Sequence, residues 1–121
     1  MTDRDRIGRK AEDLACDLLT REGYEILARR YRTRPGEIDV VGRSAGVLCF
    51  VEVRSRTRSA WSPEETISWQ KNHRIEAAAR QYIAEHSLFD EPARFDVVAV
   101  DWSGKAARVR LHRDAFEPTG D

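Results

Sequence analysis

Acidic side chains gather in two short segments whose pattern is typical of neighbouring strands. The first segment covers residues 36–41 (GEIDVV) and the second covers residues 50–54 (FVEVR). Because successive residues of a strand point to opposite faces, Glu37 and Asp39 share one face of the first segment. The connection between the segments is short, which predicts antiparallel pairing with Glu52 opposite a residue between Glu37 and Asp39. Two or three carboxylates are therefore expected at one end of this strand pair.

A cluster of carboxylates is a natural site for a divalent cation. Mg²⁺ and Mn²⁺ usually bind two protein carboxylates together with waters and substrate phosphates. Such a cation can generate hydroxide from water and stabilise charge on a phosphate under attack. The alternative is that the acids are solvated at the strand ends or paired with nearby arginines, since acid clusters are often structural networks. The spacing alone leaves both interpretations open.

Basic side chains near the acids are nearly all arginines, and the only lysines of the chain are Lys10, Lys71 and Lys105. A guanidinium forms planar bidentate contacts with phosphate, so the bias is compatible with a polyanion held beside the acids. The bias is equally compatible with a GC-rich genome that favours Arg codons. The arginines closest to the acidic segments in sequence are Arg29, Arg30, Arg32, Arg34, Arg54, Arg56 and Arg58.

Lys71 lies on the apolar face of a predicted helix. It follows Ile67 by four residues and precedes Ile75 by four, which places it on the buried stripe. Its ammonium either extends to solvent along its methylene stem or reaches a polar site at the edge of the sheet. In the second case its neighbour Gln70 lines the same cleft.

Hydrophobic periodicity predicts two helices and five strands around these residues. The third strand is apolar on both faces, which is typical of a central strand covered from both sides. The order α-β-β-β-α-β-β describes one α/β fold with helices packed on a mixed sheet. The expected elements are a helix over 7–22, strands over 24–31, 37–42 and 47–54, a helix over 62–85, and strands over 94–101 and 107–112.

Length and composition limit the class of protein. The 121 residues predict a single domain over 1–121, with a core over about 7–113 and a frayed C-terminal tail. The 21 Lys+Arg and 21 Asp+Glu give a formal net charge of zero, which excludes tight coating of nucleic acid by bulk charge alone. No apolar run is long enough for a transmembrane helix or a secretory signal, so no membrane partner is expected.

The cysteines and histidines suggest neither a disulfide framework nor a zinc site. Cys16 and Cys49 each lie in an apolar stretch, where a free thiol behaves as a small hydrophobic residue. Free thiols fit a reducing compartment, so we expect a cytoplasmic protein. His73, His86 and His112 lack the spacing of zinc ligands.

These motifs, in one consistent order from about residue 8 to 101, resemble the YraN family of small bacterial proteins. Through that family the chain is similar to the PD-(D/E)XK nuclease superfamily, and to archaeal Holliday-junction resolvases in particular. The segments 36–39 (GEID) and 50–53 (FVEV) are quite specific when they occur together. The other matching residues are Gly8, Glu12, Ala15, Gly23, Tyr24, Arg54, Arg56, Lys71, Arg74 and the segment 94–98 (RFDVV).

The resemblance implies a restriction-endonuclease-like fold and a site for Mg²⁺ or Mn²⁺. It assigns the metal-ligand role to Asp39 and Glu52, with the backbone carbonyl of Val53 as a further ligand. Glu12 matches an acid that completes the site in resolvase-like members. Glu37 matches a motif residue to which no role is assigned.

The chain departs from the superfamily pattern at Arg54, where the motif has a Lys two residues after the Glu. That Lys orients or activates the attacking water, whereas a guanidinium stays protonated and cannot act as a base. Arg54 can still bind the scissile phosphate and stabilise charge in the transition state. Lys71 is the candidate to supply an ammonium instead, because related nucleases move this Lys between positions.

Three functional hypotheses follow. The first is a metal-dependent endonuclease-like protein acting on DNA phosphodiesters, including branched or single-stranded DNA, with RNA as an open alternative. The second is a nucleic-acid-binding module that kept the fold and lost efficient catalysis, and the third is a protein-interaction scaffold with solvated acids. A homodimer is expected by analogy with two-fold resolvases. In the first hypothesis the DNA backbone is positioned by Arg30, Arg32, Arg34, Arg56 and Arg58, and the site is supported by Glu37 and Gln70.

Overall fold

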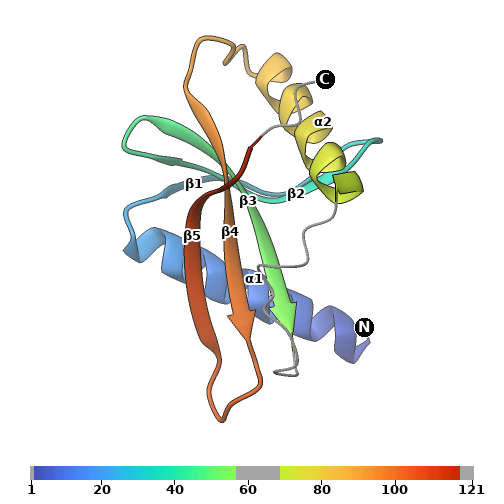
Figure 1. Cartoon of the computed structure of the whole chain (residues 1–121), viewed down its shortest axis with the longest axis vertical. Helices are drawn as coiled ribbons and strands as arrows, with labels where there is room; N and C mark the ends of the chain where they lie inside the picture. The colour runs from blue at the N-terminus through green and yellow to red at the C-terminus, as the bar shows by residue number, and fades with distance from the viewer. Residues whose placement is uncertain (1, 57–68, 118–121) are drawn as a thin grey trace.

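The computed structural model describes residues 2–56 and 69–117, and the side chains of all of these except 3, 4, 56 and 69–71. The expected order α-β-β-β-α-β-β is confirmed (Figure 1). The elements are α1 (Asp3–Arg21), β1 (Glu25–Arg32), β2 (Glu37–Ser44), β3 (Val47–Arg56), α2 (Trp69–Glu85), β4 (Ala93–Asp101) and β5 (Arg108–Phe116).

The five strands form one mixed sheet in the order β1-β2-β3-β4-β5. Neighbouring strands are antiparallel except for β3 and β4, which run parallel. A parallel pair needs a long crossover connection, and α2 lies within that connection. The sheet therefore has β3 at its centre, between an antiparallel and a parallel neighbour, as its apolar sequence predicted.

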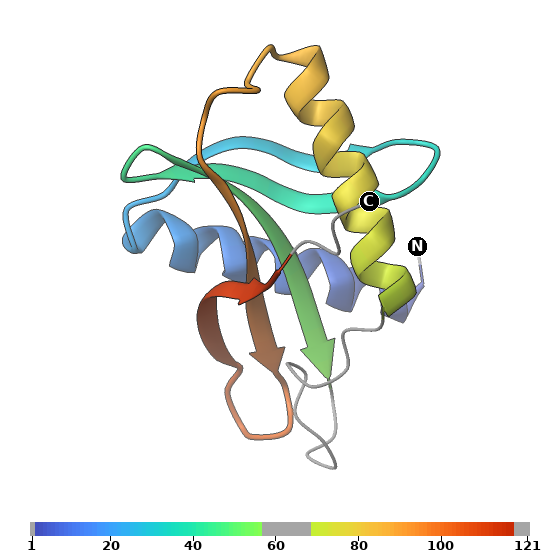
Figure 2. The ribbon, with the colours of Figure 1, turned by 45° about the horizontal axis from the view of Figure 1, so that its top comes forward.

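The two helices cover opposite faces of the sheet, α1 on one side and α2 on the other (Figures 1 and 2). This arrangement explains why β3 is apolar on both faces, because Val51 packs toward α1 and Phe50 toward α2. Residues that build the α1-side core include Ala11, Ala15, Leu19, Val40, Val98 and Val100. Residues that build the α2-side core include Ile38, Val41, Ile75, Ala78, Ala79, Tyr82 and Phe95.

Helix α1 begins four residues earlier than its hydrophobic stripe predicted. The hydroxyl of Thr2 accepts a hydrogen bond from the backbone N–H of Asp5 at 3.1 Å. The Asp5 carboxylate in turn accepts from the backbone N–H of Thr2, which completes a capping box. Capping therefore extends the helix through a polar first turn that carries no hydrophobic signal.

A two-residue turn fixes the register between β2 and β3. Ala45 and Gly46 have φ values of 49° and 81°, the left-handed pair that matches the twist of a tight hairpin. The strand expected to end at residue 42 consequently continues to Ser44. The register pairs Val40 with Val51, and Asp39 and Glu52 are the residues that adjoin this last pair on β2 and β3.

The C-terminal strand is an edge strand, as expected, but it is longer than its sequence pattern predicted. It runs from Arg108 to Phe116, and Phe116 stacks on Phe95 with ring centroids 4.8 Å apart. The predicted start of the second helix at residue 62 and the tail after residue 117 lie outside the described residues.

Candidate functional site

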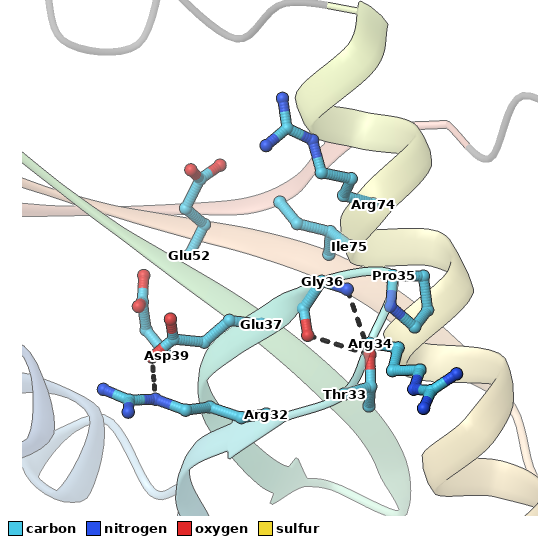
Figure 3. A pocket seen from close by; sticks show the side chains of 10 residues that line it. All are labelled: Arg32, Thr33, Arg34, Pro35, Gly36, Glu37, Asp39, Glu52, Arg74 and Ile75. Carbon is cyan, nitrogen blue, oxygen red and sulfur yellow. Dashed lines mark hydrogen bonds and ion pairs between the residues drawn. The ribbon is translucent and has the colours of Figure 1, made fainter.

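A pocket of about 620 Å³ opens where the β1–β2 turn, the ends of β2 and β3, and helix α2 meet (Figure 3). Its lining includes the three carboxylates that strand alternation placed at one end of the sheet. They are accompanied by arginines of the turn and of α2. The lining residues are Arg32, Thr33, Arg34, Pro35, Gly36, Glu37, Asp39, Glu52, Arg74 and Ile75.

Asp39 is held against the neighbouring strand by its side chain. Its Oδ2 accepts a hydrogen bond from the backbone N–H of Val53 at 2.7 Å. Val53 directly follows Glu52, so this bond keeps the Asp39 carboxylate beside the Glu52 position. A carboxylate that accepts a backbone N–H is also held in one orientation.

Glu52 is nearly inaccessible and lies against Arg54. Glu52 Oε1 and Arg54 Nε are 3.2 Å apart, and the two side chains are 4% and 11% exposed. Burying a carboxylate away from water costs roughly several kcal/mol unless a nearby cation compensates its charge. The Arg54 guanidinium places a positive charge beside the buried Glu52 carboxylate.

The turn between β1 and β2 packs directly on the backbone of α2. The Thr33 hydroxyl donates to the Gly36 carbonyl at 2.8 Å and accepts from the Gly36 N–H at 3.0 Å. A Cβ built on Gly36 would lie only 2.8 Å from the backbone carbonyl carbon of Arg74, far inside contact distance. Glycine at this position is therefore required by close approach of the two elements, which together form one wall of the pocket.

Arginines surround the carboxylates at the rim of the pocket. Arg32 is highly exposed and makes a long ion pair of 3.4 Å with Glu37. No side-chain hydrogen bond or ion pair joins Arg34 or Arg74 to any other residue that the structure describes. In Figure 3 the guanidinium of Arg74 extends to the side of the pocket that holds Glu52, whereas Arg34 points outward. The rim thus offers guanidinium groups to an anion.

Glu12 does not line this pocket. Its Oε1 accepts from Arg29 Nε at 2.8 Å and its Oε2 accepts from Arg30 Nε at 2.9 Å. Both carboxylate oxygens of this buried residue are thus engaged by adjacent arginines of β1. The structure places Glu12 and Arg30 together, and neither is among the residues that line the Asp39–Glu52 pocket.

The donor set of the pocket fits a hard divalent cation. Asp39 and Glu52 supply two carboxylates from adjacent strands, which is the number of protein carboxylates that Mg²⁺ commonly uses. Within residues 2–56 and 69–117, no three side chains of His, Cys, Asp or Glu come together as a metal-binding group. The remaining positions around a cation would therefore fall to backbone, water or substrate oxygen. Lys71, Gln70 and Arg56 have no described side chains, and Arg58 lies outside the described residues.

Two residues of α2 were assigned no role from sequence, namely Arg74, which lines the pocket, and Glu76, which does not. Arg74 follows Lys71 by three residues, one helical turn further, and that spacing was the available signal for its position. Glu76, which follows the lining residue Ile75, is buried on α2 although its sequence context predicts no buried acid. Its carboxylate lies 4.0 Å from His73 Nδ1.

A second buried polar cluster surrounds Asp96 on β4. Asp96 accepts from the Tyr24 hydroxyl at 2.6 Å, from Arg94 Nε at 3.0 Å and from the backbone N–H of Asp114 at 2.8 Å. Burial, together with the hydrogen bond to Asp96, raises the pKa of Tyr24 to about 12. This cluster joins Tyr24, which directly precedes β1, to β4 and β5 around a fully buried carboxylate. It gives Arg94 and Asp96 of the segment 94–96 (RFD) a structural role.

The cysteines behave as the apolar context predicted. Cys49 is fully buried, and burial raises the pKa of its thiol to about 11. Cys16 is partly buried on α1 and is also a free thiol. Neither of the two described helices is long and apolar enough to cross a membrane.

Comparison with known proteins identifies the family. The model of the family described as "Uncharacterised protein family UPF0102" matches residues 11–100. The chain belongs to the UPF0102 family. This confirms the YraN-type resemblance. A UPF0102 protein of Anaeromyxobacter sp. (strain Fw109-5) is 46% identical over 119 residues, which cover 98% of this chain and 90% of that protein.

Other UPF0102 proteins are similar over nearly the whole chain. One from Desulforapulum autotrophicum is 44% identical over 115 residues, 94% of this chain and 95% of the relative. One from Lachnoclostridium phytofermentans is 43% identical over 115 residues, 93% of this chain and 94% of the relative. The part matched by the UPF0102 family model includes Glu12, every residue that lines the pocket, and the Asp96 cluster up to β4.

Proposed function

We propose that this chain is a Mg²⁺- or Mn²⁺-dependent endonuclease-like protein that acts on DNA phosphodiesters. The observation that carries the proposal is the approach of Asp39 and Glu52 from adjacent strands in a pocket rimmed by Arg32 and Arg74. A protein that only binds DNA gains nothing from acids that face phosphate. Acids combined with arginines suit a site that holds a cation and a phosphate together.

The proposal gives each residue of the pocket a part. Asp39 and Glu52 hold the cation, with the backbone carbonyl of Val53 as the further ligand. The cation, when bound, supplies activation of water and stabilisation of charge on the phosphate. Arg54, buried beside Glu52, stabilises negative charge at the reacting phosphate. Lys71 is the proposed source of the ammonium that the motif Lys supplies in related nucleases.

The proposal includes the restriction-endonuclease-like fold of the PD-(D/E)XK superfamily. The mixed sheet supports this assignment. Asp39 lies on β2 and Glu52 on β3, which form an antiparallel hairpin, and β3 is the central strand with β4 as its parallel neighbour. The helices on both faces support it as well. The DNA backbone is then positioned by arginines of β1, of the β1–β2 turn and of the segment after β3, namely Arg30, Arg32, Arg34, Arg56 and Arg58.

The buried ion pair between Glu52 and Arg54 favours a second candidate function. A guanidinium that stays protonated and is 11% exposed stands where a water-activating Lys belongs. It also neutralises Glu52 without a cation. A chain with these properties can bind nucleic acid in the same pocket and turn it over slowly or not at all, as a binding module of the same fold.

Metal binding and cleavage test the proposal together. We expect Mn²⁺ to bind the wild-type protein in a calorimetric titration, and we expect Mn²⁺-dependent nicking within a panel of branched, single-stranded and duplex DNA. The double variant Asp39→Asn/Glu52→Gln keeps the shapes of both side chains and should lose both properties. Glu91→Gln, which removes a carboxylate paired with Arg43 elsewhere on the molecule, is the matched control and should keep both. If wild type and double variant behave alike throughout, the nuclease proposal is wrong.

The variant Arg54→Lys separates the two candidates. An endonuclease weakened by its guanidinium should cleave faster when the motif Lys is restored. A binding module should bind DNA as before and gain no cleavage. Both measurements use the same DNA panel, and the Asp39→Asn/Glu52→Gln background shows whether any gain depends on the pocket.

A further inference from the structure

Two adjacent arginines of β1 bind the same carboxylate on α1. Glu12 receives Arg29 Nε on one oxygen and Arg30 Nε on the other. Neighbouring residues of a regular strand point to opposite faces of the sheet and could not both reach one partner. Arg30 has a φ of 53°, in the left-handed region that residues with a side chain rarely adopt. This backbone change interrupts the alternation and turns both guanidinium groups toward Glu12.

The contacts leave one end of the Arg30 guanidinium available. Arg29 binds Glu12 through Nε and Asp13 through a terminal nitrogen, so its guanidinium is already shared between two carboxylates. Arg30 uses Nε alone, and its terminal nitrogens form no hydrogen bond or ion pair with any residue that the structure describes. The Arg30 side chain is 36% exposed, whereas that of Glu12 is 9% exposed. A buried anion therefore orients a half-exposed cation whose remaining donors suit bidentate contact with phosphate.

Arg30 also lies beside the pocket. The register pairs Arg29 with Val40 and Tyr31 with Ile38, so Arg30 occupies the strand position next to Asp39. The hydrogen bond and charge of Glu12 raise the pKa of Arg30, and the charge of Glu37 at the pocket rim acts in the same direction. Arg30 thus stands between Glu12 and the rim.

We propose that Glu12 is a positioning residue, which holds Arg30 so that its guanidinium binds a DNA phosphate adjacent to the one in the Asp39–Glu52 pocket. Arg29 braces the arrangement by neutralising the second oxygen of Glu12. Strain at Arg30 is compensated by this contact, as is usual for strained residues at binding sites. The inference rests on the proposed function for the identity of the ligand. It differs from the role implied by resemblance, in which Glu12 completes the metal site itself.

The inference is tested by whether Glu12→Gln weakens or strengthens DNA binding. Binding of a fluorescein-labelled single strand and its duplex is measured by anisotropy in EDTA, so that no metal contributes. Removing a negative charge should by itself tighten DNA binding. If Glu12 positions Arg30, however, Glu12→Gln should weaken binding by about tenfold, the equivalent of one charge-assisted hydrogen bond. Circular dichroism establishes that the variant is folded at the temperature of the measurement.

Asp13→Asn is the matched control, because Asp13 is the next residue of α1, pairs with the same Arg29 and is 65% exposed. We expect it to bind DNA as tightly as wild type or more tightly. Arg30→Ala should weaken DNA binding, and it should reduce the slope of log affinity against log salt concentration by about one. Because both residues act as a unit, Glu12→Gln/Arg30→Ala should bind no more weakly than Arg30→Ala alone. Arg43→Ala, which removes an arginine paired with Glu91, controls for bulk charge.

Glu12→Gln that binds DNA in EDTA as tightly as wild type, or more tightly, overturns the inference. So does a wild-type protein that binds no DNA in EDTA. A Mn²⁺ titration of the same variant keeps the two proposals apart. If Glu12→Gln weakens Mn²⁺ binding and leaves DNA binding unchanged, Glu12 belongs to the metal site, and the proposed function stands while this inference fails.

Discussion

Asp39 accepts a hydrogen bond from the backbone N–H of Val53, with 2.7 Å between Oδ2 and N. The bond joins the side chain of one strand to the main chain of the next, directly after Glu52. It therefore ties the relative position of the two carboxylates to the register of the β2–β3 hairpin. The stability of the hairpin and the geometry of the pocket depend on the same contact.

Asparagine and alanine at position 39 should separate these two roles. Asp39→Asn retains an acceptor for the Val53 N–H, so its free energy of unfolding should stay within about 0.5 kcal/mol of wild type. Asp39→Ala removes the acceptor and should lower the free energy of unfolding by about 1.5–3 kcal/mol, as for other hydrogen bonds to charged groups. Urea denaturation measures both, and Mn²⁺ binding should fall in both variants. Equal stability of the two variants would show that the hydrogen bond contributes little.

Gly36→Ala should loosen the contact between the β1–β2 turn and α2. The added methyl meets the Arg74 backbone, which cannot rotate away as a side chain could. Overpacking of this kind destabilises by about 1–3 kcal/mol. Gly8→Ala is the control, since nothing lies within 4 Å of a methyl group added at Gly8 on α1 and alanine favours a helix by about 0.8–1.0 kcal/mol. Thermal unfolding should shift downward for Gly36→Ala and upward for Gly8→Ala, and a downward shift of both would contradict the explanation.

Tyr24 should make the protein sensitive to alkaline pH. Its pKa is raised to about 12 by burial and by the hydrogen bond to Asp96. The folded state therefore keeps the phenol proton more tightly than the unfolded state, whose pKa is about 10. The contribution of this proton to the free energy of unfolding is therefore complete below about pH 10 and is lost as the pH rises through about 12.

The variant Tyr24→Phe has no phenol proton to lose, so it should lack this loss of stability at alkaline pH. It leaves the buried Asp96 with one donor fewer and should be less stable at pH 7 by about 1–3 kcal/mol. Its free energy of unfolding should then decline less than that of wild type between about pH 10 and 12. Urea unfolding at several pH values measures both changes, and parallel curves for the two proteins would contradict the assignment.

Glycine should be preferred to alanine at position 30. The φ of 53° at Arg30 costs a residue with a Cβ about 1–2 kcal/mol, whereas glycine adopts it freely. Arg30→Gly should therefore be more stable than Arg30→Ala by about 1 kcal/mol, although both lose the contact with Glu12. The denaturant midpoints of Arg30→Gly and Arg30→Ala measure this difference. A less stable glycine variant would show that the strand becomes regular when the arginine is removed.

The hairpin that holds Asp39 and Glu52 was predictable because its signals are local. Strand alternation and a short connection limit the register to a few choices, and the two-residue turn selects one of them. The apolar faces of β3 likewise predicted helices on both sides of the sheet. The family resemblance added roles for these residues that spacing alone left open.

The features that could not be predicted depend on contacts distant in sequence or on the backbone. Gly36 is required by Arg74, which belongs to another element and leaves no trace in the pattern around the turn. Arg29 and Arg30 should have pointed to opposite faces, and the left-handed backbone at Arg30 has no signal in an arginine. The first turn of α1 was missed because a capping box is polar, whereas periodicity detects only the buried stripe.

The irregular backbone at Arg30 has its counterpart at the opposite margin of the sheet. β1 and β5 are the edge strands, and each combines a shifted register with a left-handed residue, Arg30 in one and Asp114 in the other. Edge strands with bulges and charged side chains are poor templates for an additional strand. The sheet is thereby protected from edge-to-edge aggregation at both margins. Copies of this chain that form a dimer should meet through helices or loops, and not by continuing the sheet.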